Sequence, residues 1–165
     1  MKDLYHISFN SNLPSTLLPR EPDMLSEDSN EHNLGSRVSF APTVRQCAIA
    51  LYFNLPKDFT FNKEVNFYVY KLNTTKTLKE IPRVELEKHI FDVKVTDEVC
   101  ITEPCSIKKI GKIAVKYDKN KPIYTEFYSK RLLAGYEPTI KVTEFYTNDV
   151  INIDGIIHLK KSKGV

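Results

Sequence analysis

The sequence predicts an α+β fold with a mainly antiparallel β-sheet, either continuous or split, one well-capped helix and few others. Three observations lead to this prediction. Nine Tyr and nine Phe residues, together with many Val, Ile and Thr, favour strands over helices. Short alternations of apolar and polar residues recur along the chain, as half-buried strands require. A length of 165 residues with 41% hydrophobic and 27% charged residues fits a single domain spanning residues 1–165.

The first predicted element is a strand at residues 4–8, where apolar and polar side chains alternate around His6. A long polar loop follows at residues 10–35, with three prolines and an acidic run rich in Ser and Asn. A loop of this length in a compact domain is typically functional or mobile. Arg20 lies in it, where it either clamps a pyrophosphate with its two-pronged guanidinium or faces solvent.

A short strand at residues 37–41 leads into the helix, which we expect over about residues 43–54. Thr43 and Gln46 form a capping box, because the hydroxyl accepts from an early helical N–H while the glutamine reaches back. Pro56 stops the helix. The apolar stripe of this helix has helical spacing and comprises Val44, Cys47, Ala48 and Leu51.

The rest of the chain predicts mostly strands. Their expected ranges are 65–70, 91–95, 98–101, 107–115, 123–128, 139–146 and 156–159. A short helix or turn is expected around residues 83–89, and a turn at Ala134–Gly135. Residues 117–165 form a strand-rich tail to which the sequence assigns no role.

Several classes of function are disfavoured by what the sequence lacks. The glycine-rich nucleotide loops and the signatures of metalloproteases and serine hydrolases are missing. The three cysteines have no zinc-site spacing, so we expect free thiols and no metal. No apolar run approaches the ~20 residues that cross a bilayer, and no signal-peptide pattern follows Met1. We therefore expect a cytoplasmic protein with no membrane partner.

The basic residues concentrate in the second part of the chain. Residues 1–60 carry 5 Lys and Arg against 7 Asp and Glu, whereas residues 61–165 carry 19 against 14. The densest patch comprises Lys108, Lys109, Lys112, Lys116, Lys119 and Lys121. A solvated face that protects sheet edges is the favoured interpretation. Binding of nucleic acid by this patch, with Tyr124, Phe127 and Tyr128, is a weaker alternative that we do not expect, because no nucleic-acid motif accompanies it.

Three short pieces of the chain carry the candidate chemistry. They are residues 4–8 with His6, residues 37–42 with Ser39, and residues 96–101 with Glu98. Together they resemble the ADP-ribosyltransferase-like family, the NAD-binding split-sheet fold of bacterial toxins, poly(ADP-ribose) polymerases and small phage-borne effectors. The first piece is similar to the family's opening strand and the second to the strand that feeds a helix under the nicotinamide. The third is similar to the segment in which the catalytic glutamate precedes an apolar strand.

The resemblance covers residues 3–115, and the opening Tyr-His-Ile-Ser strand and the Ser-Phe-Ala-Pro turn are also similar to small phage and prophage proteins. If the chain is phage-encoded, the expected location is the cytoplasm of the bacterial host. The chain combines two patterns of the family, because its members of one type carry a tyrosine where Ser39 and Phe40 stand, and those of the other carry an arginine in place of His6.

The resemblance implies a role for each matched residue. His6 would bind a ribose hydroxyl, Ser39 would orient the glutamate or cradle the nicotinamide, and Phe40 or Tyr52 would supply an aromatic face. Glu98 would be the catalytic residue, holding the 2′-hydroxyl of the nicotinamide ribose and stabilising the positive charge that develops on that sugar. NAD would be the substrate, and ADP-ribose would pass to a macromolecule or to water.

Each of these residues also has a purely structural interpretation. His6 fits a hydrogen-bonded histidine of a half-buried strand, Ser39 fits the approach to a helix, and Glu98 is one of 14 acids in residues 61–165. The sequence therefore leaves open whether the protein is an enzyme. The alternative function is a non-catalytic, phage-type inhibitor or binding module on the same fold, which grips a host protein by β-augmentation or sequesters a nucleotide.

Overall fold

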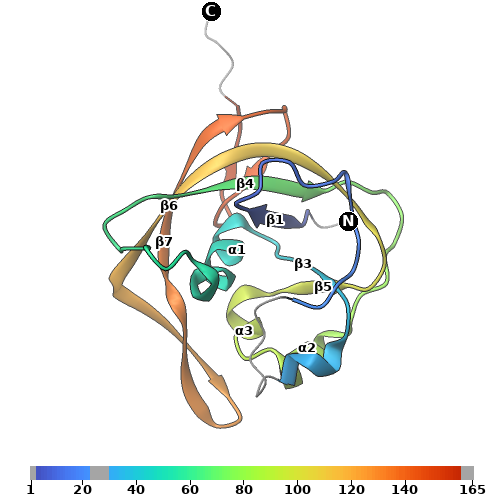
Figure 1. The fold of residues 1–165 in the computed structure, drawn as a ribbon, viewed down its shortest axis with the longest axis vertical. Coiled ribbons are helices and arrows are strands. Elements are labelled where there is room, and N and C mark those ends of the chain that lie inside the picture. The colour runs from blue at the N-terminus through green and yellow to red at the C-terminus, as the bar shows by residue number, and fades with distance from the viewer. Residues whose placement is uncertain (1–2, 23–29, 161–165) are drawn as a thin grey trace, which may run out of the picture.

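The computed structural model describes residues 3–22 and 30–160 (Figure 1). Its strands are β1 (Tyr5–Ser8), β2 (Thr16–Leu17), β3 (Val38–Phe40), β4 (Val65–Leu72), β5 (Val99–Ile101), β6 (Cys105–Phe127), β7 (Lys130–Phe145), β8 (Ile151–Asn152) and β9 (Ile157–His158). Its helices are α1 (Val44–Ala50), α2 (Arg83–His89) and α3 (Val93–Thr96), with 3-10 turns η1 (Asn30–Leu34) and η2 (Tyr52–Asn54).

The main sheet has five antiparallel strands. Its order is β1-β4-β6-β2, and β7 pairs with another part of the long strand β6. Strands β3 and β5 form a separate two-stranded sheet, and β8 and β9 form another. Two backbone hydrogen bonds between Tyr5 and Ala41, of 2.8 and 2.9 Å, join β1 to the end of β3. The predicted α+β class, with mainly antiparallel strands and few short helices, is confirmed.

An apolar cluster packs against each face of the main sheet. Successive side chains of a strand point to opposite faces, so Tyr5 and Ile7 enter one cluster and Leu4 enters the other. The first cluster joins β1, β4 and β6 to α1. The second joins β1, β4 and β6 to the β3–β5 pair, and includes Phe40. His6 shares the face of Leu4 and is therefore directed toward β3.

The predicted helix is present as α1 followed by η2. The Gln46 N–H donates to Thr43 Oγ1 at 3.2 Å, and the Thr43 hydroxyl donates to Gln46 Oε1 at 2.9 Å. Thr43 caps the helix as predicted, although the side-chain amide nitrogen of Gln46 bonds elsewhere. Val44, Cys47 and Ala48 of the predicted stripe are buried, and Leu51 packs against them.

The strand predicted at residues 91–95 is wrong, because the chain forms the helical turn α3 there. Val93 and Thr96 are both buried and lie three residues apart, which is the spacing of one helix face. The β-branched residues suggested a strand, but the side chains that need burial lie at helical spacing. Packing of the turn therefore overrides the local β-propensity.

The turn predicted at Ala134–Gly135 is also wrong, because both residues lie within β7. Gly135 has φ +150°, and a Cβ there would lie 3.3 Å from the carbonyl oxygen of Ile49 in α1. The glycine allows α1 to approach the strand closely. In this position Gly marks a backbone contact, as it often does within strands.

The first part of the long loop packs against the main sheet. The Tyr70 hydroxyl donates to the Asn10 carbonyl at 2.7 Å and accepts from the Leu13 N–H at 3.3 Å, and Lys109 Nζ donates to the Ser11 carbonyl at 2.7 Å. Residues 23–29 of this loop lie outside the described residues.

The strand-rich tail supplies one long hairpin. Beyond Val115, where β6 no longer pairs with β4, β6 and β7 continue as a two-stranded hairpin (Figure 1). At its tip the Tyr128 hydroxyl donates to the Lys88 carbonyl of α2 at 2.7 Å. The hairpin therefore spans the molecule from the main sheet to the helices that precede β5. In residues 3–22 and 30–160, no helix has the length and apolarity to cross a membrane.

Candidate functional site

Three of the residues singled out by the sequence meet where β1, β3 and β5 come together. His6 Nδ1 lies 2.9 Å from the carbonyl oxygen of Ser39. Ser39 stands opposite Cys100 in the β3–β5 pair, and its Oγ lies 3.6 Å from the Cys100 sulfur. That sulfur lies 3.5 Å from Glu98 Oε1. His6 and Glu98 are therefore both linked to Ser39, the imidazole through the backbone carbonyl and the carboxylate through Cys100 and the hydroxyl.

The contact with Ser39 fixes the proton on the His6 ring. A carbonyl oxygen only accepts, so Nδ1 must carry the hydrogen, and Nε2 of the neutral ring is left as an acceptor. Burial lowers the pKa of His6, the bond to Ser39 opposes this shift, and the nearby charge of Arg20 adds to it. His6 is therefore a neutral imidazole at pH 7, with Nε2 able to accept from a hydroxyl group.

The segment before Glu98 is tied to two helices. Asp97 has the left-handed backbone conformation, with φ 51°, which Asp adopts more readily than most residues. Its carboxylate accepts from Gln46 Nε2 of α1 at 2.7 Å and from Arg83 Nη1 of α2 at 3.0 Å. This turn fixes the direction in which the chain enters Glu98 and β5.

Two arginines flank the outer end of β3. The backbones of Arg20 and Arg37 exchange hydrogen bonds of 3.2 and 3.0 Å. Arg37 is buried and pairs with Glu31 at 3.2 Å, while its Nε has no hydrogen-bond partner among the described residues. Arg20 is exposed, and its charge reaches His6. The backbone bridge therefore fixes Arg20 beside this end of β3.

The two aromatic residues considered for the site take up other positions. Phe40 is only 2% exposed and packs edge-on against the His6 ring, with the ring centroids 6.0 Å apart. It supports the imidazole from the core. Tyr52 belongs to an aromatic cluster beside α1 that also contains Phe59, Phe61, Tyr117 and Tyr136. Tyr52 thus stabilises the first apolar cluster, and no described contact links it to His6, Ser39 or Glu98.

Asp92 is a buried acid that sequence reasoning missed. It precedes α3 and is 7% exposed, and no described residue forms an ion pair with it. Burial raises the pKa of Asp92 to about 7, and the charges of Glu98 and Glu31 add to the shift. At neutral pH the Asp92 carboxyl group is therefore protonated in part of the molecules. Glu98 consequently faces a second acid whose charge depends on pH.

A sequence signal was available for some of the missed residues. Side chains two residues apart on a strand share a face. The predicted strands therefore put Arg37 on the same face as Ser39, and Cys100 on the same face as Glu98. Asp92 had no such signal, because it lay in a segment whose alternation predicted a strand. Its burial depends on α2 and α3 packing together.

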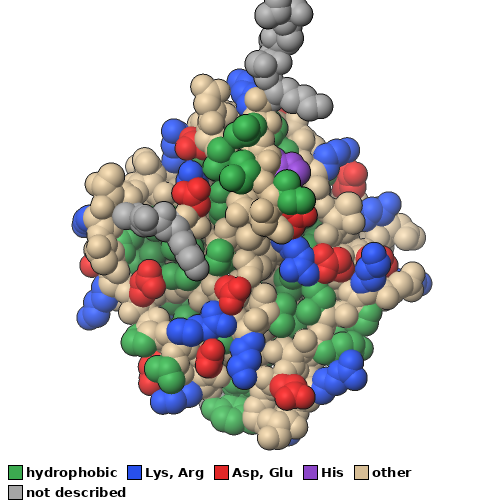
Figure 2. Space-filling model, turned by 180° about the vertical axis from the view of Figure 1, so that it is seen from behind, with side chains coloured by type: hydrophobic (Ala, Val, Ile, Leu, Met, Phe, Trp, Pro, Cys, Tyr) green, Lys and Arg blue, Asp and Glu red, His purple; other side chains and the backbone are tan. Residues whose placement is uncertain are grey.

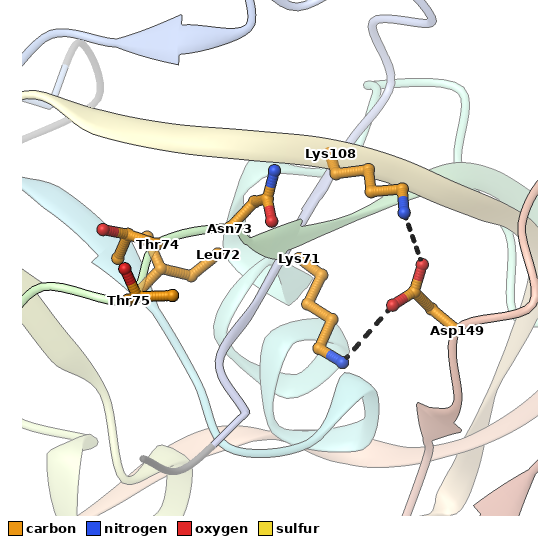
Figure 3. A pocket seen from close by; sticks show the side chains of 7 residues that line it. All are labelled: Lys71, Leu72, Asn73, Thr74, Thr75, Lys108 and Asp149. Atoms are coloured by element: carbon orange, nitrogen blue, oxygen red, sulfur yellow. Dashed lines mark ion pairs between the residues drawn. The ribbon is translucent and has the colours of Figure 1, made fainter.

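A separate pocket of about 510 Å3 lies at the end of β4 (Figure 3). Lys71 and Lys108 both point toward Asp149, whose carboxylate lies 3.7 and 3.0 Å from their amines. Lys71 also pairs with Asp3 at 3.3 Å. Because Lys71 stands opposite Tyr5, the pocket lies across the sheet from His6. It contains none of the predicted site residues, and the acids already neutralise its lysines.

The described residues include no group of three or more His, Cys, Asp or Glu side chains that is able to hold a metal ion. All three thiols are free and buried. Comparison with models of protein families, with curated proteins and with solved structures finds no match. The interpretation of the site therefore depends on its own geometry.

Replacing Asp92 with Asn tests the burial of this carboxyl group. A folded-state pKa of about 7 lies above the value of 3.8 that is ordinary for an aspartate. The folded protein therefore binds more protons, and the wild type loses stability as pH rises from about 4 to about 7. D92N carries no such charge. Between pH 4 and pH 8, the free energy of unfolding of D92N should rise by about 2–4 kcal/mol relative to that of the wild type. Urea unfolding measures this difference.

The exposed Asp58 supplies the control for this experiment. D58N should follow the pH dependence of the wild type. A stability difference between D92N and the wild type that does not change with pH would contradict the account of Asp92.

Proposed function

We propose that the chain is an ADP-ribosyltransferase-like protein that binds NAD and transfers ADP-ribose to a macromolecule or to water. The observation that carries the proposal is the path of contacts from His6 through Ser39 and Cys100 to Glu98. An imidazole acceptor, a hydroxyl and a carboxylate from three distant parts of the chain thereby share one region. The resemblance of the same three pieces to that family supports this interpretation.

The groups around this path suit the parts of NAD. His6 Nε2 would accept from a hydroxyl of the adenosine ribose, because Nδ1 is already engaged. Arg20, exposed beside His6, would pair with the diphosphate through two parallel hydrogen bonds. Glu98 would accept from the 2′-hydroxyl of the nicotinamide ribose. Phe40 would act through the His6 ring, since its own faces are buried.

Glu98 would carry the chemical step. When the bond from the ribose to nicotinamide breaks, its electron pair leaves with the nicotinamide nitrogen and positive charge develops on the sugar. A fixed carboxylate beside that sugar stabilises this charge, as carboxylates do in glycosidases. The acceptor then forms the new bond to the sugar and releases its proton. The Asp97 turn and β5 hold Glu98 in place for this role.

Substituting Glu98 with Gln should stop the release of nicotinamide while leaving the fold intact. The amide keeps the shape of the side chain but removes the charge, and we expect a loss of at least about 100-fold in kcat. HPLC measures nicotinamide, and calorimetry measures NAD binding. E103Q, a few residues along the chain, is the matched control and should behave as the wild type. Wild-type protein that neither binds nor consumes NAD would refute the proposal.

One surface favours the non-catalytic alternative. Hairpin β8–β9 exposes Ile156, Ile157 and Leu159 to 66, 60 and 59%. Figure 2 shows several separate groups of hydrophobic side chains on one face, one of them near the upper end, with acidic and basic side chains between them. Exposed apolar clusters of this kind often mark contacts with other proteins. Under this alternative, the chain is a phage-type binding module that grips a host protein in the cytoplasm.

A pull-down from bacterial lysate separates the two functions. The binding module should retain a stoichiometric partner equally well in the wild type, H6A and E98Q, and should lose it in I157D. Nicotinamide release should be lost in E98Q and kept in I157D if the enzyme proposal is right. Retention of a partner that depends on Ile157, combined with no NAD turnover, would favour the module over the enzyme.

A further inference from the structure

Cys100 is the group that stands between the hydroxyl of Ser39 and the carboxylate of Glu98. We propose that Cys100 is a positioning residue through which Ser39 orients Glu98. The inference rests on the proposed function, and it names the group through which Ser39 would orient the glutamate, one of the two roles that the resemblance implies for this serine.

The pairing of β3 with β5 creates this arrangement. Ser39 and Cys100 stand directly opposite each other in the antiparallel pair, so their side chains lie on the same face. Glu98 lies two residues before Cys100, just ahead of β5, and its carboxylate contacts the Cys100 sulfur. The sulfur lies 3.6 Å from Ser39 Oγ and 3.5 Å from Glu98 Oε1, and Cys100 is fully buried. No direct hydrogen bond between Ser39 and Glu98 occurs among the described residues, so the thiol joins them.

The chemistry of the groups gives this path one direction. A carboxylate only accepts, so the single thiol proton is donated to Glu98. The Ser39 hydroxyl must then donate to the sulfur. Burial raises the pKa of the Cys100 thiol and the charge of Glu98 adds to the shift, so the group stays protonated at neutral pH and remains a donor. Ser39 thus acts on the carboxylate through two hydrogen bonds in series.

The other two cysteines show what a purely structural thiol does in this fold. Cys47 donates to the Tyr5 carbonyl at 3.3 Å, and Cys105 donates to the Glu103 carbonyl at 3.2 Å. Both partners are backbone atoms, whereas Cys100 donates to an acidic side chain. Cys105 is as fully buried as Cys100 and lies near it in sequence. Cys105 is therefore a matched control for loss of a buried sulfur.

A double-mutant cycle tests the path. S39A and C100A should each lower kcat for nicotinamide release by about tenfold, the usual cost of a hydrogen bond to a charged group, and leave KM for NAD unchanged. The double variant should be no slower than either single variant, because both break the same path. C100S keeps a donor and should stay close to the wild type. C105A should leave kcat unchanged.

A second measurement reads the contact without NAD turnover. The 13C chemical shift of the Glu98 carboxyl carbon at pH 8 should change in C100A, because the carboxylate loses a hydrogen-bond donor, and should not change in C105A. If the wild type shows no turnover, the proposed function fails, and this chemical shift alone decides the role of Cys100. Additive losses in the cycle, or the same carboxyl chemical shift in C100A and C105A, would overturn the inference.

Discussion

The candidate site depends on the two backbone hydrogen bonds that join Tyr5 to Ala41. They connect the main sheet to the small β3–β5 sheet, and both residues are almost completely buried. Leaving a buried backbone hydrogen bond unmade costs about 1–3 kcal/mol of folding free energy. The two bonds of this junction therefore resist being broken. The junction places His6 of β1 within hydrogen-bond distance of the Ser39 carbonyl. Together with the second apolar cluster, this junction fixes the imidazole of the main sheet relative to the β3–β5 pair that leads from Glu98.

A second constraint is the distribution of charge around the junction. The imidazole of His6 is neutral because it is buried near Arg20, and Arg37 pairs with Glu31 from η1. Burial raises the pKa of Asp92, and the charges of Glu98 and Glu31 add to this shift and favour its protonated form. Asp97 is held by Arg83 and Gln46. Glu98 is thereby left as the acid of this segment that no described cation neutralises, which suits a carboxylate that stabilises positive charge on a substrate.

Local signals in the sequence predicted the parts of the site but not their arrangement. Alternation placed His6 on a strand, and the Thr43 hydroxyl marked the start of α1, because both signals depend on neighbouring residues. The pairing of Ser39 with Cys100 joins positions 61 residues apart, and no local pattern specifies such a register. Burial of Phe40 and Asp92 also depends on tertiary packing. The three pieces that carry the family resemblance adjoin one another in the fold, and both the resemblance and their role in NAD chemistry stay predictions.

The state of the His6 ring tests the account most directly, because the contact with Ser39 and the proposed use of Nε2 both depend on it. Long-range 1H–15N NMR of the imidazole, recorded between pH 6 and 8 and then during addition of NAD, reads the tautomer, the charge and the contact with the ligand. The account predicts a neutral ring with the proton on Nδ1 at pH 7 and above, and a shift of the Nε2 signal as NAD binds. A ring that gains its charge at the ordinary histidine pKa, or an Nε2 signal that NAD does not move, would contradict it.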